Sequence, residues 1–188
     1  MYRIGLDLSI KSTGICVWDT TKNIYKYYII ADHLTKSQKA FKHKDLEFID
    51  YERIKPSAED CFEVREQKKT DSIYSVMKNI QTVVKKYKKK SDVFCYIEGI
   101  SYGSSSSAAL ADLSGLNYAI RCMLRNEEIP FRIIAPSQLK KFAVGNGSAD
   151  KDLMTAAWKK CQQKMSDITE IKDDDIADAY FLSVYESI

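Results

Sequence analysis

The sequence is poor in histidine, and this limits the chemistry that the chain can perform. Its 188 residues include only two histidines, His33 and His43, and both lie in a polar, lysine-rich stretch. Serine-protease-type triads and HExxH metal sites both depend on histidine, so neither is expected here. If the chain is an enzyme, we expect it to work with carboxylates.

Other motifs and patterns are absent as well. No apolar run is long enough to span a bilayer, and no signal-peptide pattern occurs, so no membrane contact is expected. None of the five cysteines forms a CxxC pair, and we expect buried free thiols in a reducing compartment rather than zinc ligands or disulfides. The GxxxxGK[ST] phosphate-binding motif is missing, and no small-molecule cofactor is expected.

The composition is that of one globular domain. Hydrophobic residues make up 45% of the chain and charged residues 29%, and 188 residues can bury a substantial core. The net charge of +3 permits nucleic-acid binding without arguing for it. We expect residues 1–188 to form a single domain.

The apolar patterns predict an α/β fold. Five strands are predicted, at Tyr2–Leu8, Gly14–Asp19, Ile24–Ile30, Val93–Ile97 and Phe131–Ile134. The first three follow one another through short turns, which is typical of an antiparallel meander. Helices are predicted from an N-cap at Asp71 to the lysine run 85–90, and over Ala108–Asn126, Pro136–Phe142, Lys151–Met165 and Asp173–Glu186. Residues 32–70 read as an irregular insertion with a short strand at Leu46–Tyr51.

Carboxylates stand against apolar segments at three distant places in the chain. Asp7 lies in the first strand, Glu98 ends the buried fourth strand, and Asp175 and Asp178 share one face of the last helix. Asp7 could instead cap its own turn, and acids at a helix N-terminus suit the helix dipole. Gathered together, however, the four would repel one another unless divalent cations lay between them. Mg²⁺ prefers such oxygen ligands, and two ions spaced for in-line displacement would cut a phosphodiester.

Four blocks of sequence resemble RuvC-type Holliday junction resolvases, within the ribonuclease H-like superfamily. The blocks are IGLDLSIKSTG (4–14), YIEGISYG (96–103), PSQLKKFAVGNGSADKD (136–152) and DDIADAYFLS (174–183). The first block also resembles the start of the much longer actin-like kinases, but this chain is short and lacks their second phosphate loop. The resemblance implies a ribonuclease H-like fold with a five-stranded mixed sheet, an antiparallel meander followed by parallel strands, flanked by helices.

The resemblance also implies a mechanism and partners. In the family, the acids that match Asp7, Glu98, Asp175 and Asp178 hold two Mg²⁺ ions, for which Mn²⁺ substitutes. The enzymes of this family resolve four-way DNA junctions by paired symmetric nicks. Tyr102 falls near the place of an aromatic residue at the opened centre of the junction, and Lys141 and Lys151 resemble residues near the scissile phosphate and the DNA backbone. A homodimer is implied, and the small residues of Ala108–Asn126 would let another helix approach closely, unless they pack on the chain's own sheet.

The sequence departs from the family pattern at two places, and it leaves two alternative functions open. The 32–70 insertion is longer than in typical bacterial members, and Gly99 replaces a bulkier polar residue. These departures would suit a divergent, phage-encoded member, located in the cytoplasm with the nucleoid or in an infected host cell. The alternatives are an RNA-processing nuclease of the same fold, like the pre-16S ribosomal RNA maturation family, and a non-catalytic module that binds branched DNA.

Overall fold

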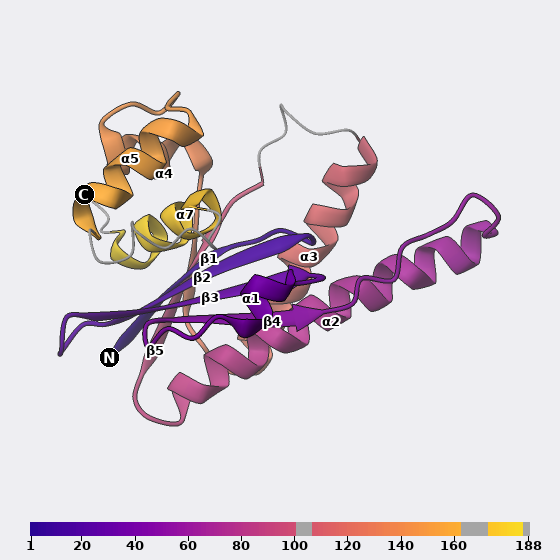
Figure 1. Ribbon diagram of the computed structural model, residues 1–188, viewed down its shortest axis with the longest axis horizontal. Helices are drawn as coiled ribbons and strands as arrows, with labels where there is room; N and C mark the ends of the chain where they lie inside the picture. Colours follow the sequence, from indigo (N-terminus) through magenta and orange to yellow (C-terminus); the bar gives the residue numbers. More distant parts are fainter. Residues whose placement is uncertain (101–106, 163–172, 186–188) are drawn as a thin grey trace.

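A six-stranded mixed sheet forms the centre of the computed structural model, which describes residues 1–100, 107–162 and 173–185 (Figure 1). The strand order across the sheet is β4-β3-β2-β1-β5-β6. The strands are β1 (Tyr2–Asp7), β2 (Ser12–Asp19), β3 (Ile24–Asp32), β4 (Leu46–Tyr51), β5 (Val93–Glu98) and β6 (Phe131–Ile134). The first three form the predicted antiparallel meander, and the pairs β1–β5, β5–β6 and β3–β4 are parallel.

The predicted fold class is confirmed, but the sheet has six strands rather than five. The additional strand is β4, which pairs in parallel with β3 over six residue pairs and forms one edge of the sheet. The segment 32–70 is therefore not irregular throughout. It contains a short helix α1 (Lys36–Ala40), the strand β4 and the beginning of the long helix α2 (Phe62–Lys88).

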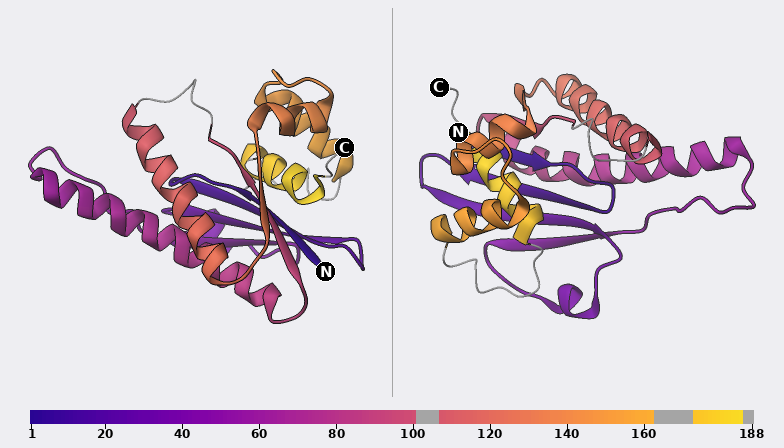
Figure 2. Two further views of the ribbon diagram at one scale, coloured as in Figure 1. Left: turned by 180° about the vertical axis from the view of Figure 1, so that it is seen from behind. Right: turned by 90° about the horizontal axis from the view of Figure 1, so that it is seen from above.

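Helices cover both faces of the sheet (Figure 2). On one face, α2 and α3 (Ser107–Asn126) pack on apolar residues such as Ile4, Leu6 and Ile97, which are buried. On the other face lie α4 (Pro136–Val144), α5 (Lys151–Cys161) and α7 (Asp173–Val184). No helix in the described part of the chain is long and apolar enough to cross a bilayer.

The long helix α2 begins nine residues before the predicted N-cap. The structure places its first residue at Phe62, so that Asp71 lies inside the helix. Residues 62–67 are exposed, and in Figure 1 the first turns of α2 project beyond the sheet. An exposed stretch carries no apolar stripe, and the apolar periodicity that marks a helix in the sequence is therefore missing from these turns.

The cysteine prediction is wrong for three of the five residues. Cys16 and Cys95 are buried, as expected, but Cys61, Cys122 and Cys161 are exposed. All five are free thiols.

Two glycines allow α7 to lie directly on the sheet. A Cβ atom at Gly5 of β1 would collide with the carbonyl oxygen of Ala179, and one at Gly14 of β2 would collide with that of Asp175. Because backbone atoms cannot move aside as a flexible side chain can, both positions require glycine. These close contacts fix the first turn of α7 against the beginning of β2, and its later turns against β1.

Candidate active site

Asp7 and Glu98 are the last residues of the neighbouring parallel strands β1 and β5, and they lie at the same end of the sheet. Leu6 of β1 pairs with Ile97 of β5, and the next residue on each strand is the acid. Parallel strands end at the same edge, so the two partly buried carboxylates lie side by side.

Helix α7 brings two further carboxylates to the same place. Asp175 lies in its first turn, above Gly14, and Asp178 follows three residues later on the same face. The Oγ of Ser12, a buried residue of β2, donates a hydrogen bond to Oδ2 of Asp175. The structure therefore gathers all four acids that the sequence singled out.

Burial, together with neighbouring charges, raises the pKa values of three of these acids. Burial raises the pKa of Asp7 well above its usual value, and the charges of Glu98, Asp178 and Asp175 raise it further. Burial and the charge of Asp178 raise the pKa of Glu98 to about 7. Burial also raises the pKa of Asp178 to about 6, against the opposing charges of two lysines. When all four carboxylates are ionised, the positive charge around them is therefore too small to balance their negative charge.

Two lysines supply part of that charge. Lys151, the first residue of α5, donates a hydrogen bond of 2.8 Å to Oδ2 of Asp174, and its charge lowers the pKa of Asp7, Glu98 and Asp178. Asp174 is partly buried, which by itself would raise its pKa, but the hydrogen bond and charge of Lys151 hold the pKa below the usual value. Asp174 therefore has a side-chain partner, Lys151, besides its favourable position in the first turn of a helix.

The second lysine is Lys140, which the sequence reading missed. Its charge lowers the pKa of Glu98 and of Asp178, whereas the neighbouring Lys141 is exposed on the same helix. The burial of Leu139 fixes the phase of α4 and hence which lysine faces the carboxylates. A DNA contact by Lys141 stays a prediction, and Tyr102 lies outside the described residues.

The donor set fits a hard divalent cation. Among the residues that the structure describes, no group of three or more His, Cys, Asp or Glu side chains is arranged to hold one metal ion. Mg²⁺, however, is usually bound by one or two carboxylates, with water and substrate phosphate completing its shell. Four neighbouring carboxylates, of which Asp7, Glu98 and Asp178 have raised pKa values, with no histidine or thiol among them, match that preference.

Comparisons with known proteins identify the family and the fold. The family described as "Crossover junction endodeoxyribonuclease RuvC" matches residues 50–185, while no curated protein matches the chain. A Thermus thermophilus RuvC structure superposes with a TM-score of 0.55 at 14% identity and covers 98% of this chain and 92% of its own. The structure titled "T. thermophilus RuvC in complex with Holliday junction substrate" gives 0.54 at 13% identity, with 98% and 91% covered.

A eukaryotic structure has the same fold. The yeast mitochondrial Holliday junction resolvase Ydc2 superposes with a TM-score of 0.52 at 13% identity, over 96% of this chain and 75% of its own. At such low identities these superpositions establish the fold alone. The family match begins after Asp7 but includes Glu98, Asp175 and Asp178, and it covers more than half of the chain. This chain therefore belongs to the RuvC family of crossover junction endodeoxyribonucleases.

Proposed function

We propose that this protein is a structure-selective DNA endonuclease that resolves four-way junctions by paired, symmetric nicks. The observation that carries the proposal is the cluster of Asp7, Glu98, Asp175 and Asp178 at one end of the sheet. Burial and mutual repulsion raise the pKa values of at least three of its members. Such a cluster costs folding free energy unless cations compensate it, which supports a catalytic rather than a structural origin.

The four carboxylates would hold two Mg²⁺ ions, and Mn²⁺ would substitute. When bound, the ions would supply positive charge and Lewis acidity for in-line displacement at a phosphodiester. The protein's own contribution is the placement of the ligands. The ends of β1 and β5 fix Asp7 and Glu98, and Ser12 holds Asp175.

Lys140 and Lys151 would orient the scissile phosphate. Both carry positive charge to the carboxylate cluster from helices on one side of the sheet. Lys151 is not expected to act as a base, because its pKa is raised, chiefly by its hydrogen bond to Asp174. A lysine that stays protonated can attract a phosphodiester and stabilise the charge that develops on it.

A homodimer would match the two-fold symmetry of a four-way junction. Helix α3 presents the exposed residues Ala108, Ala111, Tyr118 and Cys122 along its outer side. Gly115 is exposed on the same side, where a Cβ at Gly115 would lie 3.1 Å from Cδ1 of Ile73 of α2. These exposed residues of α3, Gly115 included, form the surface that we assign to the partner.

The proposal is tested by cleavage of three substrates in parallel: a synthetic four-way DNA junction, a linear DNA duplex of the same sequence, and a structured RNA. Each is incubated with Mg²⁺, with Mn²⁺ and with EDTA. We expect paired nicks in the junction with either metal, and none with EDTA. Preferential cleavage of the RNA would favour the RNA-processing alternative, and junction binding without cleavage in any metal would favour a non-catalytic module.

A further inference from the structure

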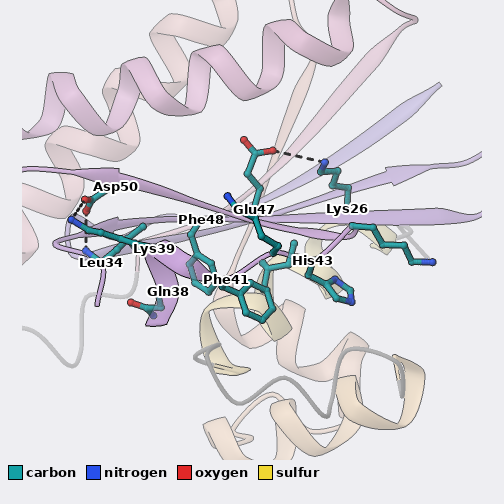
Figure 3. Close-up of a pocket in the computed structure, with 12 residues that line it drawn as sticks. Lys26, Leu34, Gln38, Lys39, Phe41, His43, Glu47, Phe48 and Asp50 are labelled. Atoms are coloured by element: carbon teal, nitrogen blue, oxygen red, sulfur yellow. Dashed lines mark hydrogen bonds and ion pairs between the residues drawn. The ribbon is translucent and has the colours of Figure 1, made fainter. Parts of the chain in front are cut away.

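A second candidate site lies beside the edge strand β4, on the part of the sheet that the 32–70 segment builds. A pocket of about 580 Å³ opens beside the edge strand β4, between this strand, α1 and the loop that joins them (Figure 3). Ligand pockets in proteins have volumes of about 300–1,000 Å³. This pocket is large enough for a small organic ligand or one unit of a polymer.

Aromatic rings line one wall of the pocket. The rings of Phe41 and His43 are stacked, with centroids 6.1 Å apart and an interplanar angle of 25°. Phe48 packs edge-on against Phe41, with centroids 5.6 Å apart, and all three residues are partly buried. Figure 3 shows these rings on the same side of β4. They form an apolar surface on which a flat ring can stack.

His43 is held so that one nitrogen remains available to a ligand. Its Nδ1 accepts a hydrogen bond of 3.2 Å from the backbone N–H of Asp45. In the neutral imidazole the other nitrogen, Nε2, then carries the proton and can donate it. The wall therefore combines a stacking surface with a hydrogen-bond donor.

The acidic residues of the pocket are turned away from this wall or already paired. The carboxylate of Glu47 lies on the opposite side of the sheet, where it pairs with Lys26 at 3.8 Å (Figure 3). It also pairs with Lys86 of α2 at 3.5 Å. Asp50 accepts the N–H of Leu34 at 2.8 Å and pairs with Lys39 at 2.7 Å, and both contacts lower its pKa. Neither carboxylate would repel an anion at the aromatic wall.

Two lysines flank the aromatic wall, and their ammonium groups are only weakly engaged by acidic side chains. Lys42 is exposed, and no acidic side chain in the described part of the chain pairs with it. Among the described acidic side chains, Lys44 pairs with Asp45 alone, at 3.9 Å, and the Lys44 side chain is 81% exposed. Exposed pairs at such distances contribute little free energy, so both ammonium groups can bind phosphate.

We propose that this pocket binds single-stranded DNA, with an unpaired base on the Phe41–His43 wall and adjacent phosphates on Lys42 and Lys44. Aromatic surfaces combined with cations are the usual means of binding single strands, because every base has a face that can stack. In duplex DNA the base faces are covered by their neighbours, so the wall selects unpaired nucleotides. The inference rests on the proposed function only for the choice of DNA as the polymer.

The test measures binding of fluorescein-labelled decathymidylate by anisotropy, in EDTA and at several salt concentrations. The double variant Lys42→Ala/Lys44→Ala should bind more weakly. It should also reduce the slope of log affinity against log salt by about 1.4, because each phosphate contact on a single strand contributes about 0.7. The matched control Lys22→Ala/Lys36→Ala removes two exposed lysines outside the pocket and should leave both affinity and slope unchanged.

The aromatic contribution is tested separately with Phe41→Leu, which keeps an apolar side chain of similar volume but removes the stacking face. Affinity should fall about fivefold or more while the salt slope stays at its wild-type value, because stacking contributes about 1–3 kcal/mol per base. Circular dichroism melting checks that each variant is folded. Wild-type affinity in both pocket variants, or no binding by the wild type, would overturn the proposal.

A free nucleotide offers the same base and phosphate as a strand, and a titration with dTMP separates the two. A strand places successive phosphates on both lysines, so decathymidylate should bind much more tightly than dTMP. Equal affinities would identify a nucleotide site and contradict strand binding. Because binding is measured without metal, it is independent of cleavage. A protein that shows pocket-dependent binding but nicks no junction with Mg²⁺ would refute the proposed function alone.

Discussion

The hydroxyl of Ser12 donates a hydrogen bond to Oδ2 of Asp175, and this bond joins the start of β2 to the first turn of α7. Ser12 is buried, whereas Asp175 is partly buried at the edge of the carboxylate cluster. A carboxylate held by a neighbour in this way keeps one orientation for a cation. We therefore regard Ser12 as a positioning residue for the proposed metal site.

Replacement of Ser12 by alanine should lower the nicking rate about 10- to 100-fold, the range typical for residues that orient metal ligands. A higher Mg²⁺ concentration should restore part of the rate, because the defect lies in metal affinity. The control is Ser183→Ala, which removes another buried hydroxyl, one that donates to the carbonyl of Tyr180 at 2.8 Å. Both variants should lose about 1 kcal/mol of stability, but only Ser12→Ala should change the metal dependence. Equal nicking by both variants would remove the positioning role.

Asp7→Asn tests the metal assignment most directly, since it keeps the shape of the side chain and removes one charge. Nicking should fall by orders of magnitude, because the amide is a weak ligand for Mg²⁺. Gel-shift affinity for the junction should survive, since phosphate contacts by lysines carry most of it. Asp152→Asn, at an exposed site in the first turn of α5, serves as the control. A variant that nicks at the wild-type rate contradicts the two-metal assignment, and one that is folded but no longer binds DNA gives Asp7 another role.

Much of the fold could be predicted because its central strands are apolar and regularly patterned. The meander and β5 lie within about two residues of their predicted bounds, and β4 lies where the short strand was expected. Pairing is harder to predict than existence: nothing local in Leu46–Tyr51 indicates that it joins the main sheet beside β3. The start of α2 was missed because its first turns are exposed and therefore lack an apolar stripe.

The four carboxylates of the site could be predicted from the sequence, but the side chains that surround them could not. A carboxylate next to an apolar strand is conspicuous in the sequence, and the structure gathers all four. Ser12 looks like a turn residue, and only the length of β2 and the approach of α7 over Gly14 give it a partner. The choice between Lys140 and Lys141 depends on the phase of a short helix, which a pair of adjacent lysines does not reveal.

The carboxylate cluster predicts an unusual dependence of stability on pH in EDTA. The pKa values of Glu98, about 7, and Asp178, about 6, are above their ordinary values of 4.5 and 3.8. Between these limits the folded protein keeps protons that the unfolded chain has released, so the free energy of unfolding falls as pH rises from about 4 to about 7. For Glu98 the loss is on the order of 3 kcal/mol.

Urea denaturation at pH 5 and pH 7.5 measures this loss. Glu98→Gln should reduce the difference between the two pH values, because it removes one of the titrating groups. Mg²⁺ should stabilise the wild type at pH 7.5 and leave Glu98→Gln nearly unaffected. If the wild type in EDTA is more stable at pH 7.5 than at pH 5, the pKa values of these acids are not raised as the structure indicates.

The proposed dimer makes Cys122 and Tyr118 of α3 the residues to examine. In a Cys61→Ser/Cys161→Ser background, Cys122 is the remaining exposed cysteine, and a short bismaleimide should link two chains through it if the helices meet across a two-fold axis. Tyr118→Glu should dissociate the dimer at micromolar concentration, because the axis would bring two like charges together. Tyr74→Glu is a close control, since Tyr74 on α2 is 54% exposed and Tyr118 is 57% exposed. Sedimentation that finds a wild-type monomer at tens of micromolar, with or without junction DNA, would exclude the dimer, and a Tyr118→Glu variant that remains dimeric would place the interface away from α3.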